Sequence, residues 1–316
     1  MKIVILDAYA ANPGDLDWSA LESLGDLTIH DRTPPEQVVE RAAGAEVVLT
    51  NKALLPAEAI SQLPDLKYIG VIATGVNIVD LEAAVKAGIT VTNVPGYSTQ
   101  SVAQLTFAFI LELASRVAEH DAAVQAGDWI RSDDFSFTTR PLIELAGKRL
   151  GIIGYGDIGQ AVAKIGEAMG MEVRVANRTP EKVPAEQRLA LDEVFQTSDV
   201  VTLHCPLTPD TENLVDAARL KSMKPTAMLI NTSRGPLVDE AALAEALRSV
   251  TIAAAGLDVL CAEPMQPDHP LLGITDCLIT PHIAWASFEA RERLIAEVAA
   301  NLKAWVDGAP VNVIGD

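Results

Sequence analysis

A glycine-rich turn, Gly154-Tyr155-Gly156-Asp157-Ile158-Gly159, lies between two regular segments and narrows the folds open to this chain. An apolar run typical of a strand, Leu150–Ile153, precedes it, and a segment with helical spacing, Gln160–Met169, follows it. Here the first glycine permits a tight turn, the second admits a pyrophosphate, and the third lets the helix pack on the strand. The helix N-terminus adds free N–H groups that attract phosphate. We therefore expect a dinucleotide to contact Gly154, Gly156, Asp157, Ile158 and Gly159.

The rest of the chain alternates short β-branched runs with longer Ala/Leu/Glu-rich segments, which is typical of βα units and parallel sheets. Its 316 residues suffice for two domains. The expected fold class is α/β, with two Rossmann-like, doubly wound parallel-sheet domains around a cleft. The last helical segment, Ser287–Asp307, has no strand to feed in the second domain, so we expect it to return to the first. We assign residues 1–99 and 286–316 to the first domain and residues 100–285 to an NAD(P)-binding Rossmann domain; the family resemblance described below implies that the first is a flavodoxin-like, substrate-binding domain.

The individual elements follow from the same alternation. The expected strands of the first domain are Lys2–Leu6, Val47–Thr50, Tyr68–Ile72 and Thr90–Asn93, with helices at Pro35–Ala43 and Val79–Ala87. After Leu150–Ile153, the expected strands of the second domain are Glu172–Ala176, Val200–His204, Ala227–Asn231, Ala254–Asp258 and Cys277–Thr280. Residues Ser98–Gly127 are mostly apolar at helical spacing and predict one long helix.

The end of the strand Glu172–Ala176 indicates which dinucleotide binds. An acidic residue about 20 positions past the glycines would bind the ribose 2′-OH of NAD. The chain instead has Asn177-Arg178-Thr179, in which the Arg178 guanidinium can pair with a 2′-phosphate and Thr179 adds a hydroxyl. This favours NADP(H), with NAD(H) left open.

Three further segments each hold a reactive side chain just after a predicted strand. They are Asn231-Thr232-Ser233-Arg234-Gly235, the stretch from Gly256 to Pro264 that contains Glu263, and Thr280-Pro281-His282-Ile283-Ala284-Trp285. Open α/β sheets place ligands at the carboxyl ends of their strands. One arginine, one glutamate and one histidine can therefore converge at the same edge of the second sheet.

With these motifs in order, the chain resembles the D-isomer-specific 2-hydroxyacid dehydrogenases over essentially its full length. GYGDIG, NTSRG, GLDV…EP and TPHIAW carry the resemblance, and ATGVNIVD, NVPGYSTQSVAQ and LHCPLT add to it. The most similar subgroup is that of the glycerate dehydrogenases and the hydroxypyruvate and glyoxylate reductases, partly because of TGVN and Trp285.

The resemblance implies roles that the chemistry of the side chains supports. His282 would be the acid–base group that protonates the carbonyl oxygen of a 2-oxo acid, and Glu263 would orient it and stabilise its protonated form. Arg234 would bind the substrate carboxylate. The backbone of Thr74, Gly75 and Val76 would bind the same carboxylate from the first domain.

The resemblance also implies the lining of the cofactor groove. Asp258 would orient the nicotinamide carboxamide, with Thr232 and Ser233 near the nicotinamide ribose. The other groove residues would be Val102, His204, Cys205, Pro206, Thr211, His282 and Ala284, together with those of the glycine turn and Asn177, Arg178 and Thr179.

Charge and composition limit the partners. Asp and Glu total 43 against 24 Lys and Arg, and the net charge of −19 disfavours nucleic acid and membrane surfaces. A small anionic 2-oxo acid would need local cations. Three cysteines are too few for a disulfide framework, which points to a reducing, cytoplasmic compartment, and no histidine shows the ligand spacing of a metal site. By resemblance, the long helix and residues 127–147 would form a homodimer interface.

Two alternatives stay open. The first is a dehydrogenase for a bulkier 2-oxo acid, since Thr138 stands where similar reductases often have tryptophan. The second is a non-catalytic, dinucleotide-sensing co-regulator on the same scaffold, like the C-terminal-binding-protein co-repressors. Formate oxidation is disfavoured, because relatives with that activity have glutamine in place of Glu263.

Overall fold

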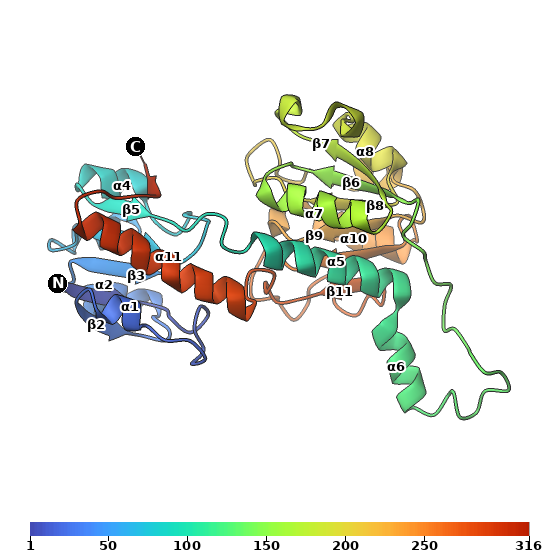
Figure 1. The fold of residues 1–316 in the computed structure, drawn as a ribbon, viewed down its shortest axis with the longest axis horizontal. Coiled ribbons are helices and arrows are strands. Elements are labelled where there is room, and N and C mark those ends of the chain that lie inside the picture. Colours follow the sequence, from blue (N-terminus) through green and yellow to red (C-terminus); the bar gives the residue numbers. More distant parts are fainter. Residues whose placement is uncertain (316) are drawn as a thin grey trace. The chain divides into compact units, whose positions relative to one another are not determined.

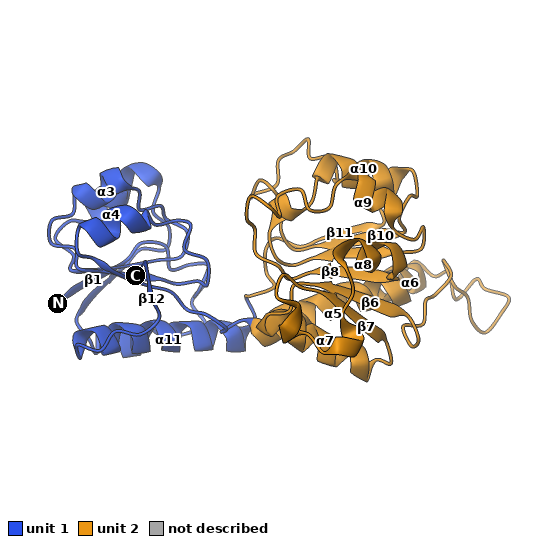
Figure 2. Ribbon diagram, turned by 90° about the horizontal axis from the view of Figure 1, so that it is seen from above, with its two compact units in different colours: residues 1–98, 286–316 blue, residues 99–285 orange. Residues whose placement is uncertain are grey.

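The computed structural model describes residues 1–315, and the chain divides into two compact units (Figure 2). One comprises residues 1–98 and 286–316, and the other comprises residues 99–285. The first junction differs from the expected one by a single residue. The binding roles that the sequence analysis assigned to the two domains stay predictions.

The first unit is built on a six-stranded sheet with the order β12-β5-β4-β3-β1-β2. All neighbouring strands pair in parallel except β12, which runs antiparallel to β5. The central strands were predicted because they are buried on both faces and read as continuous apolar runs. Two edge strands were not foreseen. β2 is mostly exposed and gives no continuous apolar run, and β12 has only two residues. The bounds are β1 Lys2–Ile5, β2 Asp26–Ile29, β3 Val47–Thr50, β4 Tyr68–Val71, β5 Thr90–Thr92 and β12 Val313–Ile314.

Helices cover both faces of this sheet. Figure 2 shows α3 (Ala57–Ser61) and α4 (Leu81–Lys86) on one side and α11 (Phe288–Val306) on the other. The last helix packs on β4, where the rings of Tyr68 and Trp305 lie 5.1 Å apart. Two short helices complete the unit, α1 at Ser19–Glu22 and α2 at Val38–Ala42.

The second unit has a six-stranded, wholly parallel sheet with the order β11-β10-β9-β8-β6-β7. An isolated parallel bridge between Val175 and Arg188 extends it beyond β7. From β6 the chain passes to β7 on one side and then to β8 on the other, so the switch point lies at the carboxyl ends of β6 and β8. The bounds are β6 Arg149–Ile153, β7 Glu172–Ala176, β8 Val200–Leu203, β9 Met228–Asn231, β10 Ala254–Leu257 and β11 Cys277–Ile279.

Two hydrophobic cores lie on the two faces of this sheet. One contains buried side chains of α5 (Thr99–Ser115) and α7 (Asp157–Ala168). The other contains those of α8 (Leu191–Thr197), α9 (Ala217–Ser222) and α10 (Glu240–Arg248). The predicted fold class, two Rossmann-like α/β domains, is thus confirmed, with one antiparallel edge strand added in the first.

The expectation of a single helix over Ser98–Gly127 is wrong. The helix breaks at Arg116, which adopts the left-handed conformation (φ 51°), and α6 (Val117–Gln125) continues at an angle of 55° to α5. The Arg116 guanidinium lies 2.8 Å from Asp276, a contact that local propensity does not encode. In Figure 1, α6 and the loop after it project away from the sheet of this unit. Within residues 1–315 no single helix is long and apolar enough to cross a membrane, although α5 and α6 reach that length and hydropathy as a bent pair.

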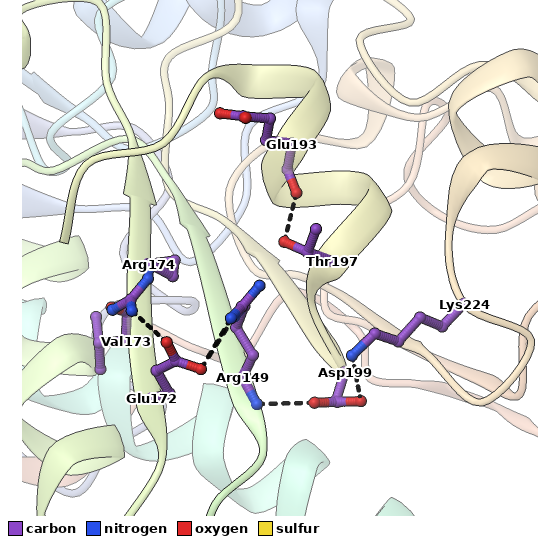
Figure 3. Close-up of polar contacts among 8 residues, drawn as sticks. All are labelled: Arg149, Glu172, Val173, Arg174, Glu193, Thr197, Asp199 and Lys224. Atoms are coloured by element: carbon purple, nitrogen blue, oxygen red, sulfur yellow. Dashed lines mark hydrogen bonds and ion pairs between the residues drawn. The ribbon is translucent and has the colours of Figure 1, made fainter.

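Charged side chains link the amino ends of the strands in the second sheet (Figure 3). Arg149 pairs with Glu172 at 3.0 Å, and Glu172 also pairs with Arg174. The backbone N–H of Arg149 donates to the Asp199 carboxylate at 2.8 Å, and Lys224 contacts the same carboxylate at 2.8 Å. These contacts between opposite charges connect β6, β7 and β8 at their amino ends.

Candidate active site

His282 and Glu263 form a hydrogen-bonded pair in the second unit. Nδ1 of His282 lies 2.7 Å from Oε2 of Glu263, and Oε1 of Glu263 accepts from the backbone N–H of Leu260 at 3.0 Å. An ionised carboxylate only accepts hydrogen bonds, so this contact assigns a proton to Nδ1. Nε2 is therefore the nitrogen left to exchange a proton with a ligand.

The turn that carries His282 is held by the Asp258 carboxylate at the end of β10. Oδ1 accepts from the Thr280 hydroxyl at 2.5 Å and from the Ile283 N–H at 2.8 Å, while Oδ2 accepts from the Ala284 N–H at 2.8 Å. Asp258 is 1% exposed, and this burial raises its pKa despite the hydrogen bonds. His282 has φ 55°, a conformation that a non-glycine residue keeps where its surroundings fix it. Asp258 therefore positions the backbone of the histidine.

Arg234 lies in a turn that its neighbours close. The Asn231 side chain donates to the Arg234 carbonyl at 2.8 Å and accepts from the Ser233 N–H at 3.0 Å. At Gly235 a Cβ would lie 2.0 Å from the carbonyl carbon of Leu260, so only glycine allows this close approach. The turn thus packs against Leu260, whose backbone N–H donates to the Glu263 carboxylate. Arg234 is exposed and can present its guanidinium to an anion.

The glycine turn after β6 has the geometry that pyrophosphate binding requires. Gly154 has φ 97°, and a Cβ there would lie 2.5 Å from the carbonyl oxygen of His204. A Cβ at Gly159 would lie 2.2 Å from the Gly154 carbonyl oxygen, whereas a Cβ at Gly156 would meet nothing within 4 Å. Gly156 therefore faces open space at the start of α7. A turn that binds phosphate needs such space. Asp157 is exposed and Ile158 is half-buried beside it.

Asn177 connects the glycine turn to the segment after β7. Its Oδ1 accepts from the Tyr155 N–H at 3.1 Å, and its Nδ2 donates to the Thr179 carbonyl at 2.9 Å. Arg178 and Thr179 are exposed at the end of the strand. The position at which NAD-binding domains place a carboxylate therefore carries a neutral amide with an exposed cation next to it.

The expected ribose-binding residues, Thr232 and Ser233, lie directly after β9. The hydroxyl of Thr232 is 3.2 Å from that of Thr106 on α5. Ser233 donates through its hydroxyl to the Leu203 carbonyl at 2.7 Å. The Ser233 bond holds the NTSRG turn against the end of β8, and the next residue of the chain after β8, His204, lies next to Gly154 of the glycine turn.

The loop after β8 supplies the other expected groove residues. Burial lowers the pKa of His204 to about 3, so its ring is neutral, and its Nε2 lies 2.9 Å from the Thr202 hydroxyl. Burial raises the pKa of Cys205. The Thr211 hydroxyl donates to the Pro206 carbonyl at 2.8 Å and closes the loop. The last two expected groove residues, Val102 and Ala284, are buried.

The residues expected to bind the substrate carboxylate from the other domain lie in the first unit, after β4. The Thr74 hydroxyl donates to the Val94 carbonyl at 2.8 Å, and the Asn93 side chain donates to the Thr74 carbonyl at 2.7 Å. Thr74 is exposed, and Gly75 and Val76 are half-buried. Their binding role stays a prediction.

The cysteines and histidines of residues 1–315 are not grouped for metal binding. No three His, Cys, Asp or Glu side chains in this range could hold an ion together, and the three thiols are free. The expected absence of a metal stays a prediction.

Comparison with known proteins shows the family of the chain. The family profile described as D-isomer specific 2-hydroxyacid dehydrogenase, NAD binding domain, matches residues 107–284. The chain is 46% identical over 320 residues to the hydroxypyruvate reductase of Blautia hydrogenotrophica, and the match covers 99% of each. The chain belongs to the D-isomer-specific 2-hydroxyacid dehydrogenases. The family resemblance of the sequence motifs is confirmed.

Two further relatives extend this comparison. The glycerate dehydrogenase of Methylorubrum extorquens is 43% identical over 282 residues, covering 89% of this chain and 88% of the relative. A solved acyclic imino acid reductase in complex with NADPH and D-Arg is 32% identical, with a TM-score of 0.88 over 99% of this chain and all of the relative. As a 2-hydroxyacid dehydrogenase, the protein is an oxidoreductase that uses a nicotinamide dinucleotide.

Some residues that hold the candidate site were not foreseen. Asn231 and Gly235 hold the turn of Arg234, the Thr280 hydroxyl donates to Asp258, and Asp258 has a second role in holding the histidine turn. Two sequence signals for these residues were available: an asparagine followed by a turn, and a glycine next to Arg234. Their partners lie on other strands, so the sequence did not show which turns they would close.

Proposed function

We propose that the protein reduces hydroxypyruvate and glyoxylate to D-glycerate and glycolate, prefers NADPH, and uses His282 as its acid–base group. The observation that carries this proposal is the 2.7 Å contact between His282 Nδ1 and the Glu263 carboxylate. It leaves Nε2 as the atom that exchanges a proton.

The proposed reaction adds a hydride to the substrate C2 and a proton to its carbonyl oxygen. The bound dinucleotide supplies the hydride. His282 gives its Nε2 proton to the carbonyl oxygen, and the charge of Glu263 stabilises the protonated ring before this transfer. Asp258 fixes the turn on which the ring stands, so that the donor atom is held in place.

Substrate binding is assigned to Arg234, with the backbone of Thr74, Gly75 and Val76. A chain with a net charge of −19 repels small anions at long range, so a local guanidinium is needed. Arg234 is exposed in a turn that Asn231 and Gly235 hold rigid. Its planar donors match a carboxylate.

The preference for NADPH is inferred from the end of β7. Asn177 supplies no carboxylate for a ribose 2′-OH, and both ends of its amide are occupied by Tyr155 and Thr179. The neighbouring Arg178 is exposed and can pair with a 2′-phosphate.

A homodimer forms part of the proposal. Large apolar side chains are exposed on α6 and on the loop after it, including Ile130 at 89% and Phe135 at 90%. Side chains of this kind favour contact with another protein surface. The others are Val117, Trp129 and Leu142.

The test is a panel of initial rates for hydroxypyruvate, glyoxylate, pyruvate and phenylpyruvate, each with NADPH and with NADH. Fast turnover of the first two with NADPH is expected. Activity limited to phenylpyruvate would instead indicate a dehydrogenase for bulkier acids. No activity with any pair would indicate a dinucleotide-sensing protein.

A further inference from the structure

A second carboxylate–histidine pair lies next to the loop that carries Glu263. Glu240, the first residue of α10, accepts through Oε1 from the Cys261 backbone N–H at 2.8 Å. Its Oε2 lies 3.1 Å from Nε2 of His269. One carboxylate thus contacts both ends of the segment 261–269.

The pair is buried and its protons can be assigned. The side chains of Glu240 and His269 are only 14% and 6% exposed. Nδ1 of His269 accepts from the Leu271 N–H at 3.3 Å, so the proton lies on Nε2 and is donated to Glu240. A buried carboxylate is costly unless hydrogen bonds compensate it, and the Cys261 N–H and the His269 ring supply them.

The attachment at Cys261 is directly connected to the proposed acid–base pair. Cys261 follows Leu260, whose N–H holds Oε1 of Glu263 at 3.0 Å, while Oε2 of Glu263 contacts His282. A shift of the backbone at Cys261 would therefore move a hydrogen-bond donor of Glu263. The thiol is not the active group here, since burial and then the charge of Glu240 raise the pKa of Cys261 to about 12.

We propose that Glu240 is a positioning residue for the proton transfer. By fixing both ends of the segment 261–269, its carboxylate sets the place at which Glu263 meets His282. The proposal rests on the acid–base role given above to His282. Small misplacements of a catalytic group are known to cost large factors in rate.

The decisive variant is Glu240→Gln. Its amide oxygen can still accept from Cys261, but its NH₂ group faces the Nε2–H of His269, so one of the two contacts is lost. We expect kcat to fall about tenfold, while the Kd of the dinucleotide and the thermal midpoint change little. The solvent deuterium isotope effect on kcat should increase, because proton transfer becomes a slower step.

The double variant Glu240→Gln with His269→Gln tests the contact itself. A glutamine at 269 offers an amide oxygen that can accept from the NH₂ group at 240, so the bridge reforms and kcat should recover. Glu245→Gln is the matched control, since Glu245 is an exposed carboxylate on the same helix. It should leave kcat and the isotope effect unchanged.

A readout independent of turnover separates this proposal from the proposed function. In E240Q, the NMR signal of the His282 imidazole should move toward its position in E263Q, and it should return in the double variant. A His282 signal unchanged in E240Q, or a loss of kcat that follows the thermal midpoint and is not rescued, would overturn the positioning role. A wild-type protein that turns over none of the 2-oxo acids would overturn the proposed function, while the NMR comparison would still decide the role of Glu240.

Discussion

Asp258 shows how much of this site is held through backbone atoms. Its carboxylate accepts from Thr280, Ile283 and Ala284, and these bonds fix His282 at a positive φ. The positions of His282, Glu263 and Arg234 near the ends of strands could be predicted from the sequence, while their roles stay proposals. The groups that hold them could not, because a carboxylate at the end of β10 does not reveal that its partners lie beyond β11.

The exposed side chain of Arg178 predicts how a single substitution changes the choice of cofactor. Arg178→Ala should raise the KM for NADPH about tenfold or more, the value of one charge-assisted contact, and should leave the KM for NADH within about twofold. Lys164→Ala, which removes an exposed cation from α7, is the control. Equal effects of R178A on both cofactors would remove Arg178 from the phosphate site.

Elements were predicted well where burial alone determines them. β3, β4 and β8 are buried along their whole length and read as apolar runs. The break between α5 and α6 was missed because arginine favours helix, whereas Arg116 adopts the left-handed conformation and its guanidinium contacts Asp276, 160 positions away. Long-range contacts of this kind override local propensity.

The charged residues at the amino ends of the second sheet predict a pH-dependent contribution to stability (Figure 3). Burial works against the charged form of Asp199, but the Arg149 N–H and the Lys224 ammonium outweigh it, so the pKa of Asp199 is lowered. A lowered pKa in the folded state means that the stabilisation is complete above the unfolded pKa, about 3.9, and is lost as the pH falls through the folded value.

The corresponding variant is Asp199→Asn, measured by urea unfolding between pH 7 and pH 3. It should lower the free energy of unfolding by about 1 kcal/mol at pH 7, and the difference from the wild type should shrink below about pH 4. Asp210→Asn, at an exposed loop position, should have little effect at pH 7. A difference for D199N that grows on acidification would contradict the assignment.

At the scale of the whole molecule, the exposed apolar residues on α6 and its following loop predict association of two chains. Light scattering should give the mass of a dimer for the wild type. The variant Ile130→Glu with Phe135→Glu places charges on side chains that are 89% and 90% exposed, and it should give a monomer without loss of the fold. A wild-type protein that is monomeric at micromolar concentration would contradict the proposed interface.

His282→Ala tests most directly whether His282 donates the proton to the substrate. Its kcat for hydroxypyruvate with NADPH should fall by at least about a hundredfold, the usual contribution of a general acid, while the Kd of NADPH stays within about twofold. His30→Ala, a half-buried histidine in the first unit, is the control and should keep wild-type rates. An H282A variant that retains most of its turnover would show that another group moves the proton.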